Sequence, residues 1–337
     1  MEPSVRGGQL AAKPSEDDAG VDRLSALPND VLLLILIGLE DAAAAGRTSV
    51  LASRWRRLWA RLPELRFPFS TDPRVIASAL VAHEASISCL DVGTEDAAPE
   101  PVAAWLPAAA RRLSGTLVFT NRVPGKNHND DGEERRGAFE LPCLQNATSV
   151  SLDLGCLGLA VPRAGVFARL TELSLSHVQF RGPCVLGDAV SSRRCPCLER
   201  LIVRNTLGLT NLTVRSNSLR HMELDRVRGL QQLTIDAAAL EYLKVFTCFY
   251  HCRTRPVANI SARQLKVLRW RDLFDRSSVK LGRVKHLQSL RTDLFFVYAS
   301  SSNNSCLGLL RCFKIIQELS LTLVYLVSAL PLLFGIM

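Results

Sequence analysis

Histidine is scarce in this sequence, and the residues that build common catalytic sites do not cluster. The 337 residues include six histidines, and no two of them form a His-x-x-x-His pair. No G-x-S-x-G nucleophile turn and no glycine-rich phosphate loop occurs, and the paired acids at 130–131 and 133–134 lie in a polar stretch. We therefore expect no catalytic residues, no metal ligands and no cofactor, and we predict that the protein is not an enzyme.

Cysteine pairs with the spacing of metal sites are also missing. The ten cysteines are irregularly spaced, and "CPC" at 195–197 and "CFYHC" at 248–252 are the only close groups. Neither group has the C-x-x-C geometry of a zinc site, and the set does not resemble a disulfide framework. We expect buried free thiols in a reducing compartment. Residues 1–20 lack the apolar segment of a signal peptide, so the expected location is cytoplasmic or nuclear.

Charge of one sign is not concentrated in any block. Lysine and arginine together number 41 against 32 acidic residues, which gives a formal net charge of +9. The excess is mostly arginine and is spread along the chain, so we do not expect nucleic acid as a partner. The hydrophobic fraction of 47% is enough for a large core and excludes wholesale disorder.

One apolar run stands out near the start, in "LPNDVLLLILIGL" at Leu27–Leu39. A helix from Pro28 to Leu39 would be about 16–18 Å long, which is too short for a bilayer core of about 30 Å. A helix that is apolar on every side must be covered on every side. We therefore expect one side of this helix to pack within its own module and the other to meet a second protein.

Two more helices are predicted after this run. The alanines at 42–45 give a short helix that Gly46 is expected to end, and Arg47–Leu62 is expected to form a third helix that ends before Pro63. The third helix would bury Leu51, Trp55, Leu58 and Leu62 on one face and expose Arg54, Arg57 and Arg61 on the other. Three short helices bury too little apolar surface to be stable alone, so this module should dock onto something larger.

Residues 22–65 resemble an F-box in its plant form. The resemblance rests on Leu27-Pro28, the run Val31–Leu36, "RTSVL" at 47–51 and the Trp55/Trp59 pair. The sequence departs from the family in "IGLED", which lacks the proline common after the first helix, and in the four alanines that replace larger side chains.

The F-box resemblance implies a binding role. In that family the three helices insert into the Skp-type adaptor of a cullin-RING ubiquitin ligase. Leu34 and Leu58 are expected to pack inside the module. The residues implied to contact the adaptor are Leu27, Pro28, Val31, Ile35, Leu39, Val50, Leu51 and Trp55. The alternative is a helical cap on the following domain, but a cap would not need apolar residues on every side of its first helix.

A second pattern, apolar-x-x-apolar-x-apolar, recurs seven times after the helical module. The copies occupy residues 170–175, 198–203, 219–224, 240–245, 265–270, 287–292 and 316–321. A period between 20 and 29 residues with this phrase indicates leucine-rich repeats. Phrases at half the period, 209–214 and 230–235, predict a return strand or a turn on the outer side. Segments 87–92, 115–119 and 147–154 are expected to be irregular opening repeats, and 121–137 is predicted to be a mobile polar loop.

The repeats also predict a binding surface. Side chains alternate along a strand, so the leucines should point into the core and the residues between them should share one concave face. A mixture of charged and aromatic residues on such a face suits a protein partner. The candidate target-binding residues are Arg200, Arg204, His221, Glu223, Asp225, Tyr242, Lys244, Phe246, Arg269 and Arg271, with Ile202 and Arg291 on the same face. For each residue alone, an ordinary solvated position is the alternative.

The predicted fold is an α+β or α/β solenoid, with a short three-helix F-box followed by a curved leucine-rich-repeat domain. The expected segments are a disordered leader at 1–20, the F-box at 21–66, a linker with opening repeats at 67–146, the repeats at 147–323 and an apolar end at 324–337. Leu319–Met337 has the length of a tail anchor, but Pro331 and the phrase at 316–321 favour a strand followed by a poorly ordered, aggregation-prone end. Relatives often continue into an FBD region, which nothing here resembles, so a truncated chain is expected.

These features predict the non-catalytic substrate-recognition subunit of an SCF-type ubiquitin ligase. Its expected partners are a Skp-type adaptor, a cullin reached through that adaptor, and an unidentified protein substrate. One alternative is a leucine-rich-repeat scaffold that is not assembled into an active ligase. Another is a receptor tethered to a membrane by its apolar end, and this alternative is not favoured.

Overall fold

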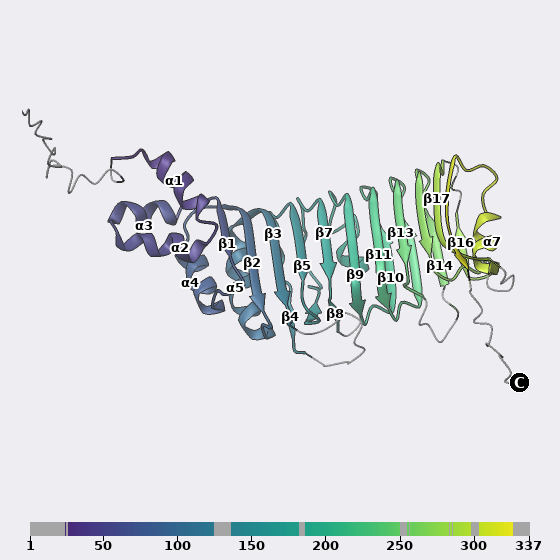
Figure 1. The fold of residues 1–337 in the computed structure, drawn as a ribbon, viewed down its shortest axis with the longest axis horizontal. Coiled ribbons are helices and arrows are strands. Elements are labelled where there is room, and N and C mark those ends of the chain that lie inside the picture. The colour runs from purple at the N-terminus through teal and green to yellow at the C-terminus, as the bar shows by residue number, and fades with distance from the viewer. Residues whose placement is uncertain are drawn as a thin grey trace, which may run out of the picture.

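The computed structural model places a small group of helices at one end of a long ladder of strands (Figure 1). The structure describes residues 24, 26–124, 136–181, 186–249, 255, 257–282, 284, 286–297 and 303–325. The predicted leader at 1–20 lies outside the described residues, as do 125–135 of the predicted loop and 326–337 of the predicted apolar end.

The helical module, residues 26–62, contains three α-helices and one turn of 3-10 helix. Their bounds are α1 Asn29–Gly38, α2 Ala42–Arg47, the 3-10 turn Thr48–Val50 and α3 Ser53–Trp59. The single helix expected over 47–62 was therefore wrong, because the extended backbone of Ala52 separates the 3-10 turn from α3. Gly46 does not end α2 but lies inside it, where an added Cβ would come within 3.2 Å of Trp59 Nε1.

A parallel main sheet follows the helices in the order β1-β2-β3-β5-β7-β9-β11-β13-β15-β17-β18. Three short strands, β4, β6 and β8, lie off this path. The bounds are β1 Glu64–Phe67, β2 Ile87–Glu95, β3 Leu113–Arg122, β4 Ala138–Glu140, β5 Ser149–Asp153, β6 Gly158–Ala160, β7 Glu172–Ser176, β8 Gln179–Phe180, β9 Arg200–Leu207, β11 His221–Arg228, β13 Tyr242–Phe246, β15 Val267–Arg271, β17 Ser289–Val297 and β18 Glu318–Tyr325.

The repeat phrase fixes where each strand of the second half begins. All seven copies form strands of the main sheet, and each strand begins two residues after the first apolar residue of its phrase. The 21-residue spacing becomes the sheet register, in which Arg200 pairs with His221 and His221 pairs with Tyr242. The leucine-rich-repeat prediction is therefore confirmed.

A second parallel sheet, in the order β10-β12-β14-β16, forms the outer layer over part of the repeats. Its strands are β10 Asn211–Arg215, β12 Gln232–Asp236, β14 Val257–Ser261 and β16 Val279–Leu281. Strands β10 and β12 come from the two phrases at half the period, as predicted. Their apolar side chains, for example Leu212 and Leu233, are fully buried in the same core as the main sheet.

Helices replace outer strands at the two ends of the solenoid and, in one short case, in its middle, beside β10. They are α4 Pro73–Ala82, α5 Pro99–Arg112, α6 Leu186–Ala189 and α7 Asn304–Leu310. Because α2 packs against both α4 and β1, the helical module and the repeats share one continuous core. Within the described residues, no helix is long and apolar enough to cross a membrane.

The buried side chain of Asn121 joins three segments of the opening repeats. Its Oδ1 accepts hydrogen bonds from Thr94 Oγ1 at 3.0 Å and from the backbone N–H of Ala97 at 2.9 Å. Its Nδ2 donates to the carbonyl oxygens of Ala97 and Leu154, at 3.3 and 3.4 Å. The prediction that Asn121 lies in a polar mobile loop was wrong, because β3 continues to Arg122. The Asn121 amide instead pairs backbone groups of neighbouring segments.

We expect Asn121→Ala to lower the free energy of unfolding by about 2–3 kcal/mol, because truncation leaves buried donors and acceptors unpaired. Thermal and urea unfolding followed by circular dichroism would measure the change. The control Asn211→Ala, at an exposed position of β10, should stay within about 0.5 kcal/mol of the parent. An equal loss in both variants would contradict the assigned role of Asn121.

Candidate functional site

One face of α1 is buried and the opposite face is open. Leu32 and Leu36, one helical turn apart, are 0% and 2% exposed and face the module core where α1 packs on α3. Leu34 is 68% exposed because two residues at about 100° each rotate it to the far side of the helix. The expectation that Leu34 packs internally was therefore wrong, whereas Leu58 is buried as predicted.

Exposed apolar side chains are concentrated in the helical module and just before it. Of the seventeen large apolar side chains that are exposed in the described residues, seven fall within residues 24–51. We call them the apolar surface: Leu24, Val31, Leu34, Ile35, Leu39, Val50 and Leu51. Such a concentration in so short a segment is typical of an interaction site rather than of ordinary scattered exposure.

Most of the predicted adaptor-contact residues are accessible. Val31, Ile35, Leu39, Val50 and Leu51 belong to the apolar surface, and Val50 is the most open at 85% exposure. Pro28 is also exposed and Leu27 is half-buried.

Trp55 does not fit its predicted adaptor-contact role, because its side chain is only 4% exposed and packs in the module core. Because α3 begins at Ser53, the buried face of this helix is formed by Trp55, Leu58 and Trp59. Leu51 lies before the helix and is left outside this face.

Two polar contacts that the sequence analysis missed fix the shape of the helical module. Arg54, expected on a solvated edge, donates from Nε to Asn29 Oδ1 at 2.7 Å and from a terminal nitrogen to the carbonyl of Leu27 at 2.6 Å. These bonds tie α3 to the start of α1. Trp59 Nε1 donates to the carbonyl of Ala42 at 2.9 Å and thereby joins α3 to α2.

The second candidate surface is the open face of the main sheet, formed by the side chains that alternate with the buried apolar ones on β7, β9, β11, β13, β15 and β17. Its residues include all ten candidate target-binding residues, together with Glu172, Ile202 and Arg291. The structure therefore brings the predicted set together on one surface. In β11, for example, Met222 and Leu224 are fully buried while Glu223 between them lies on the open face.

Carboxylates pair with cations in the central strands of the open face. Glu223 accepts a hydrogen bond from Arg204 at 2.7 Å and lies 2.8 Å from His221 Nε2. Burial alone would raise the pKa of Glu223, but hydrogen bonds from Arg204 and His221 hold the pKa below its ordinary value. Lys244 Nζ donates to Asp225 Oδ2 at 2.7 Å.

Aromatic rings support cations on the same face. The rings of His221 and Tyr242 are stacked, with centroids 4.2 Å apart and planes 2° apart. The guanidinium carbon of Arg269 lies 5.4 Å from the centre of the Tyr242 ring. The Phe246 ring lies under Arg271 at 4.7 Å and near Lys244 Nζ at 5.4 Å. These contacts are typical of cation–π interactions.

A half-buried carboxylate directly after β15 was not anticipated from the sequence. Asp272 accepts hydrogen bonds from the backbone N–H groups of Cys248, Phe249 and Leu273. Burial raises the pKa of Asp272 despite these three bonds. The one sequence signal for this backbone-bonding role is the position of Asp272 directly after a repeat strand, at the start of a turn.

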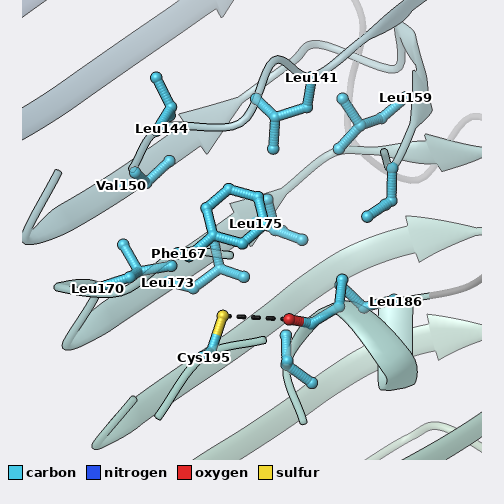
Figure 2. Close-up of a pocket in the computed structure, with 13 residues that line it drawn as sticks. Leu141, Leu144, Val150, Leu159, Phe167, Leu170, Leu173, Leu175, Leu186 and Cys195 are labelled. Carbon is cyan, nitrogen blue, oxygen red and sulfur yellow. Dashed lines mark hydrogen bonds between the residues drawn. The ribbon is translucent and has the colours of Figure 1, made fainter. Parts of the chain in front are cut away.

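Figure 2 shows a cavity between the main sheet and the outer segments, lined almost entirely by apolar side chains. Cys195 borders it and donates from Sγ to the carbonyl of Ala189 at 3.1 Å. Burial raises the pKa of this thiol to about 12, so it stays protonated and unreactive at neutral pH. The described residues that line the cavity offer no charged group, amide or hydroxyl to orient a ligand.

The described residues form neither a metal-ligand cluster nor a disulfide bond. Across the part of the chain that the structure describes, no group of three or more His, Cys, Asp or Glu side chains could hold a metal ion. The eight described cysteines are free. Cys195, Cys248 and Cys306 are buried as expected, but Cys156 and Cys197 are exposed, because each lies in a turn outside the strands.

Comparison with known proteins agrees with the repeat fold. A family model described as "FBD-associated F-box protein At5g56370, LRR repeats" matches residues 102–282. Curated relatives come from Arabidopsis thaliana. The putative F-box/FBD/LRR-repeat protein At4g03220 is 28% identical over 265 residues, which cover 74% of this chain and 51% of the relative. The putative F-box/LRR-repeat protein At4g15060 is 26% identical over 267 residues, covering 71% and 58%.

The matched region covers only part of each relative's length. The F-box/FBD/LRR-repeat protein At2g04230 is 25% identical over 272 residues, which cover 70% of this chain and 56% of the relative. The chain thus spans about half the length of the curated relatives it matches. Because the family model covers more than half of the chain and the strands follow its repeats, the chain belongs to the plant F-box proteins with leucine-rich repeats.

Proposed function

We propose that the protein is the substrate-recognition subunit of an SCF-type ubiquitin ligase. In this role the apolar surface of the helical module binds a Skp-type adaptor, and the adaptor connects the protein to a cullin. The open face of the main sheet binds the protein target. The observation that carries the proposal is the concentration of exposed apolar side chains on a module whose own core is already complete.

The energetics of the apolar surface support binding. Burying a large apolar side chain contributes ~1.5–3 kcal/mol, whereas association costs ~4–15 kcal/mol in lost freedom of motion. One or two exposed leucines therefore could not support a stable complex. The seven side chains of the apolar surface can offset that cost.

The mechanism would be proximity rather than bond chemistry by this chain. Holding a target near a ubiquitin-charged enzyme turns the transfer into an effectively intramolecular reaction. Such tethering works best when the two binding surfaces keep a fixed separation. Figure 1 shows the helical module at one end of the sheet, and one continuous core joins it to the repeats. We infer a non-catalytic role and a cytoplasmic or nuclear location.

We expect Leu34→Asp with Val50→Asp to weaken binding to a recombinant Skp-type adaptor by at least about tenfold, because two charges would enter an apolar interface. Isothermal titration calorimetry with the full chain measures the affinity. Both positions are exposed, so the fold should be retained. The control Val81→Asp changes an equally exposed residue of α4 and should bind like the parent. Unchanged affinity in the double variant would refute the assigned interface.

Assembly beyond the adaptor is tested by adding a cullin. We expect the full chain, the adaptor and the cullin to co-elute as one complex in size-exclusion chromatography, and the Leu34→Asp/Val50→Asp variant to elute alone. Adaptor binding without recruitment of the cullin would instead favour the scaffold alternative. Binding to neither protein would contradict the whole proposal.

A further inference from the structure

The charges on the open face divide into two zones. In the first zone each cation has a carboxylate partner: Arg200 with Glu172 at 3.4 Å, Arg204 with Glu223 at 2.7 Å and Lys244 with Asp225 at 2.7 Å. In the second zone, on β15 and β17, lie Arg269, Arg271 and Arg291, which we call the arginine cluster. Among the described residues, none of these three side chains forms an ion pair, that is, a nitrogen–carboxylate oxygen distance of 4.0 Å or less.

The three arginines are close neighbours. Arg269 and Arg291 are directly paired in the register of β15 and β17, which places their backbones about 4.8 Å apart. Arg271 is two residues further along β15, about 6.6 Å away on the same face. Like charges at this spacing repel one another, so a bound anion is favoured there.

Neighbouring acids do not neutralise the arginine cluster. Asp272, next to Arg271, is half-buried and uses its carboxylate oxygens for three backbone N–H groups. On β18, Glu318 is in register with Ser289 rather than with Arg291, and Arg291 Nε donates instead to Ser320 Oγ at 3.1 Å.

Two of the guanidinium groups are held in place by rings of the preceding strand. Arg269 lies over Tyr242 and Arg271 lies over Phe246, both from β13. Stacking on the ring uses the face of the guanidinium and leaves its N–H groups at the edge for hydrogen bonds. A group already held in one orientation loses less entropy on binding, and its fork of donors matches a carboxylate.

The surroundings favour a protein segment over a nucleic acid. Nucleic-acid surfaces are extended basic stripes that follow a phosphate backbone. Here only three arginines without a carboxylate partner are clustered. Further along the open face, β7 and β11 carry the carboxylates of Glu172, Glu223 and Asp225, so the described part of the face has no continuous basic stripe. A short acidic stretch followed by neutral or basic residues fits this pattern of charge.

We propose that the arginine cluster binds an acidic segment of the target protein through its Asp or Glu carboxylates. The proposal rests on the proposed function, because it assigns a chemical class to the target held by the open face. Tyr242 and Phe246 act as supports for the arginines rather than as the main contacts.

The test is binding of a fluorescently labelled ten-residue glutamate peptide to the full chain, measured by fluorescence anisotropy. Arg269→Gln with Arg271→Gln should raise the Kd about tenfold or more, because charge-assisted hydrogen bonds are lost. The matched control Arg66→Gln with Arg220→Gln removes the same net charge from arginines that already have carboxylate partners and lie outside the candidate target-binding residues. This control should change the Kd less than about twofold, since the unpaired charges remain.

A second variant protects the test against a folding defect. Arg269→Lys with Arg271→Lys keeps both charges but removes the planar fork, so we expect a smaller loss of affinity than in the glutamine variant. Equal losses in the arginine cluster and control variants would overturn the proposal, because they would show an effect of net charge alone. Equal binding of a ten-residue glutamine peptide, or tighter binding of single-stranded DNA at the same residues, would also overturn it.

Adaptor binding is measured in parallel on the same variants. Peptide binding that depends on the arginine cluster in a chain that does not bind the adaptor would overturn the proposed ligase function and still support the anionic site. Adaptor binding without selective binding of the glutamate peptide would support the proposed ligase function and overturn the proposed role of the arginine cluster.

Discussion

Parallel pairing of the repeat strands in a fixed register is the constraint on which the rest of the structure depends. Strands β7 to β18 pair so that buried positions lie beside buried positions, for example Leu201, Met222 and Leu243 in neighbouring strands. A slip of one residue would turn every leucine of a strand toward solvent. The same register aligns the residues between the leucines, so the core and the open face are two consequences of one pairing pattern.

The continuous core joins the helical module rigidly to the repeats. Trp59 of the helical module forms an edge-on contact with His83 at the end of α4, with ring centroids 6.0 Å apart. Burial, with a smaller contribution from Arg112, lowers the pKa of His83, so the neutral imidazole is favoured inside this junction. A stiff connection of this kind suits a protein that must hold a partner at one end and a target at the other.

On the open face, the free energy that a charged side chain can contribute to binding depends on whether it already has an ion-pair partner. Where Glu223 and Asp225 pair with neighbouring cations at 2.7 Å, each charge is already neutralised, so a charged group of a partner gains little free energy there. Arg269 and Arg271 differ from these cations. Aromatic rings support their guanidinium groups, and no carboxylate among the described residues forms an ion pair with them. Specificity is therefore expected at the C-terminal part of this face rather than across all of it.

The sequence by itself determined the repeat strands, because period-2 burial and a period near 21 residues leave one way to stack them, and it located the exposed run on α1. It could not decide the roles of Leu34, Trp55 and Asn121. Each depends on how distant segments pack. Helix α1 packs on α3 with Leu34 on the far side, and the same packing encloses Trp55 in the module core. The backbone groups of Ala97 and Leu154 give Asn121 its bonds. Only the tertiary structure brings such distant groups together, which is why local patterns predicted the strands and missed these contacts.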